Sequence, residues 1–184
     1  MVRDEVSRIT RLVVVSGCSG GGKSTLLAEL EQRGSGIVEE PGRRVIARER
    51  MNKGRALPWV DLVAFARKAL DMARRDRSWA LRASGLVFFD RGLVDAAAAL
   101  EHATGEAALQ RVADERYNRR VFLVPPWREI FENDADRRHG YDEAVEEIER
   151  LKDAYDKLGY ETLTVPRLPV TDRADFIRAR LLAN

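Results

Sequence analysis

The sequence is poor in cysteine and histidine, with one cysteine, Cys18, and two histidines among 184 residues. A single thiol forms no internal disulfide and cannot build a zinc site from cysteine ligands. No stretch of about 18 consecutive apolar residues occurs, which excludes a membrane-spanning helix. The first eight residues also lack the apolar core of a signal peptide. These absences predict a cytoplasmic protein without a membrane partner.

An excess of charge of one sign is missing too. The chain has 32 Lys and Arg residues and 30 Asp and Glu residues, which gives a net charge of +2 at pH 7. This balance excludes a general polyanion binder, so no nucleic-acid partner is expected. The length and the 45% apolar share favour one domain over residues 1–184, with residues 1–10 as a loose tail. We expect a monomer or a homodimer.

Short β-rich runs alternate with longer amphipathic stretches. The expected strands are Leu12–Ser16, Gly36–Glu39, Leu86–Asp90, Val121–Val124 and Thr162–Val165, of which Gly36–Glu39 is the weakest and belongs at or near an edge. The expected helices are Ser24–Arg33, Pro58–Ser84 (with Pro58 in the first turn), Asp142–Leu158 (ending at Gly159) and Arg173–Leu182. Unbroken apolar strands are typical of parallel sheets that helices cover on both faces. The pattern predicts an α/β fold with about five parallel strands.

The clearest motif is a glycine-rich loop between the first strand and the first helix. It comprises Gly17, Cys18, Ser19, Gly20, Gly21, Gly22, Lys23 and Ser24, followed by Thr25, and it fits G-x-x-x-x-G-K-[ST]. Glycines let successive backbone N–H groups point at one anion, and the helix N-terminus adds positive potential. Lys23 is expected to reach the β- and γ-phosphates, and the Ser24 hydroxyl to bind Mg²⁺. The motif predicts ATP and Mg²⁺ as ligands.

Cys18 lies inside this loop and has two interpretations. A thiol near a helix N-terminus can have a lowered pKa and become reactive. Alternatively, Cys18 is a small residue tolerated at a variable position of the loop, which is the interpretation we favour.

Carboxylates follow two of the expected strands, at the edge of the sheet where ligands bind in such folds. Asp90 ends the third strand, where an aspartate holds Mg²⁺ directly or through water. The next residue, Arg91, is a cation where ATP-driven machines commonly carry a second carboxylate, which argues against an efficient ATPase. After the second strand, Glu39 or Glu40 can accept a proton from a substrate hydroxyl, and Glu40 is preferred because it is nearer the turn.

Residues 128–140 are a polar segment after the fourth strand and form a candidate lid. Arg137 and Arg138 would fold over the triphosphate and stabilise charge in the transition state. An exposed loop of unspecialised charges is the alternative. Trp127, after two prolines, is either part of a substrate pocket or a cover for the core. Asn52-Lys53 is not followed by the aspartate that guanine recognition requires.

Together these motifs resemble a known family. The resemblance rests on Gly17–Ser24, on Glu40 with Arg43 and Arg44, on Phe88–Gly92, on Val121–Trp127, on Asn133–Arg138 and on Tyr155–Tyr160. The chain is similar, from about residue 12 to 178, to the small predicted-ATPase/AAA-domain P-loop family, which resembles the nicotinamide riboside kinase domain and, more distantly, the deoxynucleoside kinases. The resemblance implies a three-layer kinase-like P-loop fold with strand order 2-3-1-4-5.

The resemblance also implies roles for three residues. It places Glu40 in the acceptor site and Asp90 with Arg91 in the acceptor and Mg²⁺ sites, although Glu39-Glu40-Pro41 departs from the family's Pro-Glu order. The favoured hypothesis is an ATP- and Mg²⁺-dependent kinase for a small acceptor, nucleoside-like by resemblance. A regulatory nucleotide-binding module with slow hydrolysis and a true ATPase are the alternatives.

Overall fold

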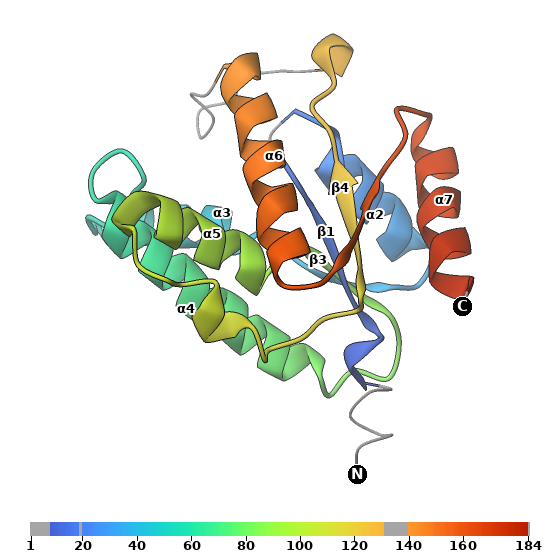
Figure 1. The fold of residues 1–184 in the computed structure, drawn as a ribbon, viewed down its shortest axis with the longest axis horizontal. Coiled ribbons are helices and arrows are strands. Elements are labelled where there is room, and N and C mark those ends of the chain that lie inside the picture. Colours follow the sequence, from blue (N-terminus) through green and yellow to red (C-terminus); the bar gives the residue numbers. More distant parts are fainter. Residues whose placement is uncertain (1–7, 19, 131–139, 184) are drawn as a thin grey trace.

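The computed structural model describes residues 8–18, 20–130 and 140–183, and it is a three-layer α/β sandwich (Figure 1). All four strand pairings are parallel, and the strand order is β2-β3-β1-β4-β5. The strands are β1 (Leu12–Gly17), β2 (Gly36–Val38), β3 (Val87–Asp90), β4 (Arg120–Val124) and β5 (Glu161–Thr164). The predicted five-stranded sheet, its order and the edge position of the second strand are confirmed.

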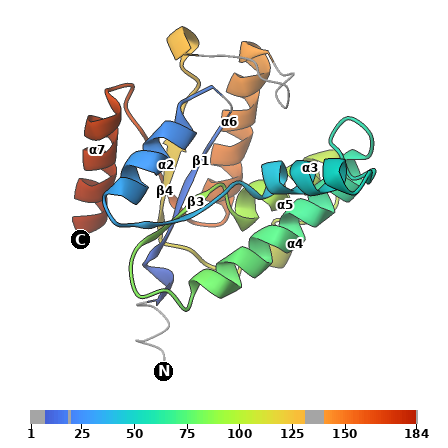
Figure 2. The same cartoon turned by 180° about the vertical axis from the view of Figure 1, so that it is seen from behind.

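Alternating side chains of the central strand β1 pack into two separate hydrophobic cores, one on each face of the sheet. Leu12 and Val14 face one side of the sheet, whereas Val13 and Val15 face the other, as the two-residue period of a strand requires. The first face is covered by α4 (Leu62–Ala80), α5 (Leu93–Thr104) and α6 (Tyr141–Lys157), and the second by α2 (Lys23–Gln32) and α7 (Val170–Leu182). Figure 2 shows α2 and α7 together on the second face.

The helix α3 (Pro41–Met51) packs mainly on α4 rather than on the sheet. Its contact is a small third cluster formed by Val45 with Ala69 and Met72 of α4. The two helices make a hairpin whose connecting turn lies at one end of the molecule, away from the sheet (Figures 1 and 2). In the part of the chain that the structure describes, no helix combines the length and apolarity that a membrane crossing requires.

The predicted helix over residues 58–84 is too long at both ends. Pro58 lies in a turn and not in the first helical turn, because Asp61 is the N-cap of α4 and its carboxylate accepts a hydrogen bond from the Ala64 N–H at 2.9 Å. Trp59, in the same turn, is 40% exposed. Gly159 does follow the end of α6 with a left-handed φ of 73°, as predicted.

A buried carboxyl group connects three elements beneath the carboxyl ends of the strands. Asp95, in the first turn of α5, accepts hydrogen bonds from the Ser16 hydroxyl of β1, from the Gly92 N–H at 2.8 Å and from the Tyr155 hydroxyl of α6 at 2.5 Å. Ser16 and Tyr155 are fully buried, and Asp95 is 4% exposed. Since buried polar groups are costly unless they are paired, this network fixes α5 and α6 relative to β1.

We expect Tyr155→Phe to lower the free energy of unfolding by about 1–2 kcal/mol, because the substitution removes a hydrogen bond to a buried carboxyl without changing the ring packing. Urea denaturation followed by circular dichroism measures the change. Ser84→Ala, at an exposed position, is the control and should change stability by less than about 0.5 kcal/mol. Equal stability of Tyr155→Phe and the parent protein would show that the hydrogen bond does not stabilise the fold.

Candidate functional site

The phosphate loop connects β1 to α2, and its glycines are required by geometry. Gly17 has a φ of 127°, and a Cβ atom there would lie 2.2 Å from the Val124 carbonyl oxygen. Gly20 and Gly22 also have left-handed φ angles, 78° and 75°. Such values are strained for other residues. Ser19 lies outside the described residues.

Lys23 is the first residue of α2, and it is only 7% exposed. Its ammonium group donates to the carbonyl oxygens of Gly17 at 3.3 Å and Cys18 at 3.1 Å. It also lies 3.9 Å from Asp90 Oδ1 at the end of β3. The two neighbouring strands β1 and β3 therefore bring the predicted lysine and aspartate together, whereas Ser24 and Thr25 are exposed at the mouth of the loop.

Three charged side chains from three elements meet beside this pair. Arg91, directly after β3, lies between Glu40, the N-cap of α3, and Glu147 of α6. Its Nη1 donates to Glu147 Oε1 at 2.7 Å, and its Nε is 3.6 Å from Glu40 Oε1. Arg43 adds a 3.2 Å hydrogen bond to the other oxygen of Glu40. Of the two glutamates left open by the sequence, Glu40 lies in this cluster and Glu39 is exposed.

The cluster shifts the ionisation of its members. Burial pushes the pKa of Glu40 upward, but the positive charges of Arg91, Lys23 and Arg43 outweigh it and hold the pKa below its usual value. Glu147 likewise has a lowered pKa, because Arg91 overcomes the effect of burial. Burial raises the pKa of Asp90, and Lys23 offsets it only in part. Glu40 and Glu147 are thus stabilised in the ionised form.

The backbone at Arg91 is unusual, with a φ of 64° in a residue that is not glycine. Such a conformation persists only where the surroundings hold it in place. Here the Arg91 N–H donates to the Val15 carbonyl at 3.1 Å, and the guanidinium is held by Glu147. Sequence analysis missed Glu147, because one acidic residue in an acidic helix carries no local signal.

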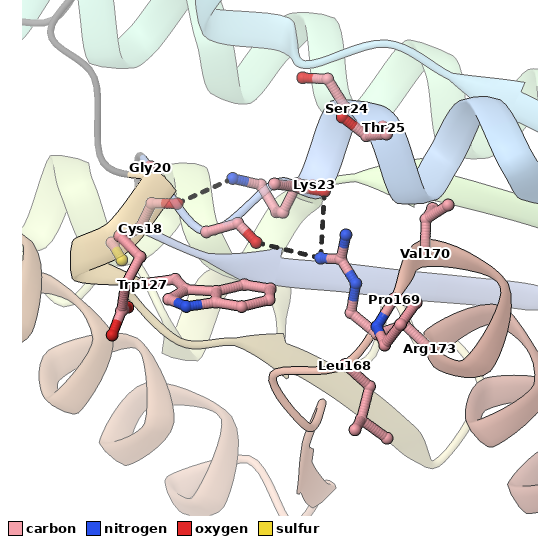
Figure 3. Close-up of a pocket in the computed structure, with 13 residues that line it drawn as sticks. Cys18, Gly20, Lys23, Ser24, Thr25, Trp127, Leu168, Pro169, Val170 and Arg173 are labelled. Carbon is pink, nitrogen blue, oxygen red and sulfur yellow. Dashed lines mark hydrogen bonds between the residues drawn. The ribbon is translucent and has the colours of Figure 1, made fainter.

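A cavity of about 560 Å³ opens beside the phosphate loop (Figure 3). Its walls are the loop itself, Trp127 after β4, and Leu168, Pro169, Val170 and Arg173 at the start of α7. Of the two interpretations of Trp127, the structure therefore supports a pocket wall. A planar aromatic ring beside aliphatic side chains suits a flat apolar ligand group such as a nucleobase.

Arg173 links this cavity to the phosphate loop, and sequence analysis did not single it out. Its Nη1 donates to the carbonyl oxygens of Gly21 at 3.2 Å and Gly22 at 3.4 Å (Figure 3). The guanidinium carbon lies 5.8 Å from the centre of the Trp127 ring. Arg173 is 5% exposed, and its Nε has no hydrogen-bond partner among the described residues. Burial also lowers its pKa.

A second cavity of about 450 Å³ lies on the other side of Lys23. Its polar lining residues are Ser24, Glu31, Glu39, Glu40, Arg43, Arg44 and Asp90, and apolar residues of α2, β2 and α3 complete the wall. Asp90 Oδ1 is buried without a hydrogen-bond partner among the described residues. A buried carboxylate oxygen that accepts no hydrogen bond, in a cavity that Ser24 also lines, fits a hard divalent cation such as Mg²⁺, which prefers oxygen ligands. Arg137 and Arg138 lie outside the described residues, as does most of the candidate lid.

Comparisons with known proteins agree with this fold. A family model described as an AAA domain matches residues 12–173. Shikimate kinase from Acinetobacter baumannii, solved in complex with shikimate, superposes with a TM-score of 0.62 at 16% identity over 98% of both chains. Deoxyadenosine kinase from M. mycoides with bound dATP gives a TM-score of 0.54 at 14% identity, over 92% of this chain and 98% of that one. No curated protein matches this chain.

The strand order and the phosphate loop define a P-loop fold with the kinase-like arrangement of strands. The chain belongs to the AAA domain family, whose model covers most of its length. At these low identities the two kinases are similar to this chain in fold, and their substrates are properties of those proteins.

The environment of Cys18 predicts an unreactive thiol. Its side chain is completely buried, and burial raises its pKa from 9.0 to about 11, despite the nearby Lys23. The thiolate fraction near pH 8 is then about 100-fold smaller than for an ordinary cysteine. We expect iodoacetamide to label the native protein at least about 100-fold more slowly than the urea-unfolded protein, as measured by mass spectrometry. Equally fast labelling of both states would instead indicate an activated thiol.

Proposed function

We propose that this protein is an ATP- and Mg²⁺-dependent kinase that transfers the γ-phosphoryl group to a hydroxyl of a small acceptor. The observation that carries the proposal is the placement of Glu40 and Arg91 directly beside the Lys23–Asp90 pair. ATP-driven machines commonly carry a second carboxylate, which activates water, at the position after Asp90, and this chain has an arginine there.

The nucleotide would bind along the phosphate loop. Backbone N–H groups of residues 17–22 and the N-terminus of α2 suit the phosphates, and Lys23 suits the β- and γ-phosphoryl oxygens. The cavity beside Trp127 would hold the base. Because Arg173 donates to loop carbonyls and lies near Trp127, it would keep the two parts of the nucleotide site in register.

Ser24 and Asp90 would hold Mg²⁺. When bound, the ion neutralises charge on the phosphoryl oxygens that develops during transfer. Asp90 also orients Lys23 through the 3.9 Å ion pair.

Glu40 would accept the proton of the acceptor hydroxyl. Glu40 is ionised near neutral pH, as a proton acceptor must be, and the cations that lower its pKa also lie beside it to meet the charge of the phosphoryl group. Arg91 would meet the negative charge of the transferring group, and Glu147 would hold Arg91 in position. Arg137 and Arg138 are proposed as lid residues that close over the triphosphate once the acceptor is bound. A nucleoside-like acceptor is proposed by resemblance.

The first test concerns the nucleotide. Lys23→Ala removes a charge-assisted contact to the phosphates and should weaken ATP binding by about 10- to 100-fold while the protein stays folded. Isothermal titration calorimetry measures the affinity. Lys53→Ala, which removes an exposed lysine far along the chain, is the matched control and should bind ATP like the parent. Unchanged affinity in Lys23→Ala would mean that the glycine-rich loop is not the nucleotide site.

The second test concerns the acceptor. ATP consumption is measured with shikimate, deoxyadenosine and other nucleosides and ribosides, against the rate without acceptor. For an accepted compound, Glu40→Gln should lower kcat by about 10²- to 10⁴-fold with little change in ATP affinity, since the proton acceptor is lost. Glu39→Gln, at the exposed neighbouring position, should keep the parent rate. If no compound raises ATP consumption above the background, the kinase proposal fails and a regulatory nucleotide-binding module takes its place.

A further inference from the structure

Charge is strongly segregated along this chain, although the total is nearly balanced. Residues 43–82, which form the α3–α4 hairpin and the residues after it, contain 12 Lys and Arg residues and only 4 Asp and Glu residues. Helix α6 has the opposite character, with 7 Asp and Glu residues and 3 Lys and Arg residues. The basic and acidic regions are thus carried by different elements of one fold.

The end of the α3–α4 hairpin exposes apolar side chains together with cations. We call this the tip surface, and it consists of Arg48, Met51, Lys53, Arg55, Trp59 and Val60. Met51 is 80% exposed, Val60 49% and Trp59 40%. Arg48, Lys53 and Arg55 are exposed and form no ion pair with any residue that the structure describes.

The tip surface is held by specific contacts and is not a frayed end. Glu49, at 8% exposure, accepts hydrogen bonds from the Ala56 N–H at 2.9 Å and from Lys68 of α4 at 2.6 Å. Gly54 N–H donates to the Glu49 carbonyl at 2.8 Å, and Asp61 caps α4. The apolar side chains are therefore presented to solvent by an ordered turn. Clustered exposed apolar residues of this kind mark interaction surfaces.

Helix α6 presents a complementary surface. Its acidic face consists of Asp142, Val145, Glu146, Glu149 and Asp153, all of them exposed, with Val145 at 37%. The four acids form no hydrogen bond or ion pair within the described part of the chain. The opposite side of the helix packs on the core through Leu151 and Tyr155. Because the helix repeats every 3.6 residues, the acidic face points away from the core that Leu151 and Tyr155 contact, and no described residue of this chain pairs with its acids.

We propose that two copies of this chain form a pair in which the tip surface of each copy binds the acidic face of α6 of the other. The charges and the exposed apolar residues of the two surfaces match, and both surfaces belong to this chain. A two-fold pair makes the contact twice, so each of the two contacts needs to bury only about half of the roughly 800 Å² per partner that is usual for a specific interface. Lipid headgroups and nucleic acids match only the cations of the tip surface and leave the acidic face unexplained.

Sedimentation velocity over a range of protein concentrations tests this proposal. Three double variants are compared with the parent. The first, Arg48→Glu with Arg55→Glu, reverses the sign of charge on the tip surface. The second, Glu146→Arg with Glu149→Arg, reverses the sign of charge on the acidic face. Arg75→Glu with Arg82→Glu is the matched control, because these exposed arginines of the α4 end also lack ion-pair partners among the described residues but lie outside both surfaces.

We expect the parent and the control to form pairs, and each of the other two variants to weaken pairing by about 100-fold, since attraction is replaced by repulsion. An equimolar mixture of these two variants should pair again, because the now negative tip surface of one variant faces the now positive α6 surface of the other. Pairing of the parent should also weaken at high salt. ATP affinity should stay unchanged in all three variants, which shows that they are folded and separates this proposal from the proposed kinase activity.

Three results would overturn the pair. The parent remains a single chain at the highest concentration, the control variant dissociates as much as the other two, or the mixture of the two reversed variants fails to associate. The parent chain could also bind as a monomer to anionic phospholipid vesicles or to a single-stranded oligonucleotide. If Arg48→Glu with Arg55→Glu abolishes that binding, the tip surface is assigned to that partner instead of to a second copy.

Discussion

The hydrogen bonds to the buried carboxyl group of Asp95 are the constraint on which the site depends. They join Ser16, one residue before the phosphate loop, to the start of α5 and to Tyr155 of α6. Tyr155 and Glu147 are eight residues apart, about two helical turns, so they share one face of α6. Anchoring Tyr155 therefore fixes where Glu147 meets Arg91. The hydrogen bond of Tyr155 to Asp95 thus fixes the position of α6 relative to the phosphate loop, which follows β1.

The charges of the site alternate in sign. Lys23, Asp90, Arg91 and Glu40 are arranged so that each cation has a carboxylate close to it. This pairing lets the protein bury several charges in a small volume, where an isolated charge would be very costly. It also gives two carboxylates different ionisation behaviour, since Arg91 holds the pKa of Glu40 down while burial raises the pKa of Asp90. Two carboxylates of one small site thus differ in ionisation because their environments differ: Glu40 is held ionised by cations, and Asp90 is desolvated.

Much of the fold was predictable, because its signals are local. The apolar strands, the weak edge strand and the glycine-rich loop are each defined by a short run of consecutive residues. Parallel strands joined by crossover helices are compatible with only a few sheet topologies. The periodicity did not predict α5, because its Ala-rich sequence is apolar almost all round and shows no polar stripe. It also missed α3, although Pro41 stands at its first turn, where proline is favoured.

The residues of the candidate site also fall into those that a local sequence signal indicates and those that only tertiary packing selects. Four of them, Lys23, Glu40, Asp90 and Arg91, could be singled out because each lies at or after the carboxyl end of a strand. Parallel strands bring these ends to one edge of the sheet. Glu147 and Arg173 come from helices distant in the sequence. Nothing in their local sequence separates them from neighbouring acids and arginines that face solvent. Only the packing of α6 and α7 against the sheet selects them, and packing is a tertiary property.

Arg173 shows how such a residue can matter more than its sequence context indicates. Its guanidinium group holds the carbonyl groups of Gly21 and Gly22 from the side of α7, while Lys23 holds those of Gly17 and Cys18 from the side of α2. With carbonyls at both ends of the loop held this way, the loop N–H groups are left for other acceptors. Since the Trp127 ring lies near the same guanidinium, a ligand that fills the cavity contacts the group that shapes the phosphate loop. The two halves of the candidate nucleotide site are therefore joined by one buried arginine.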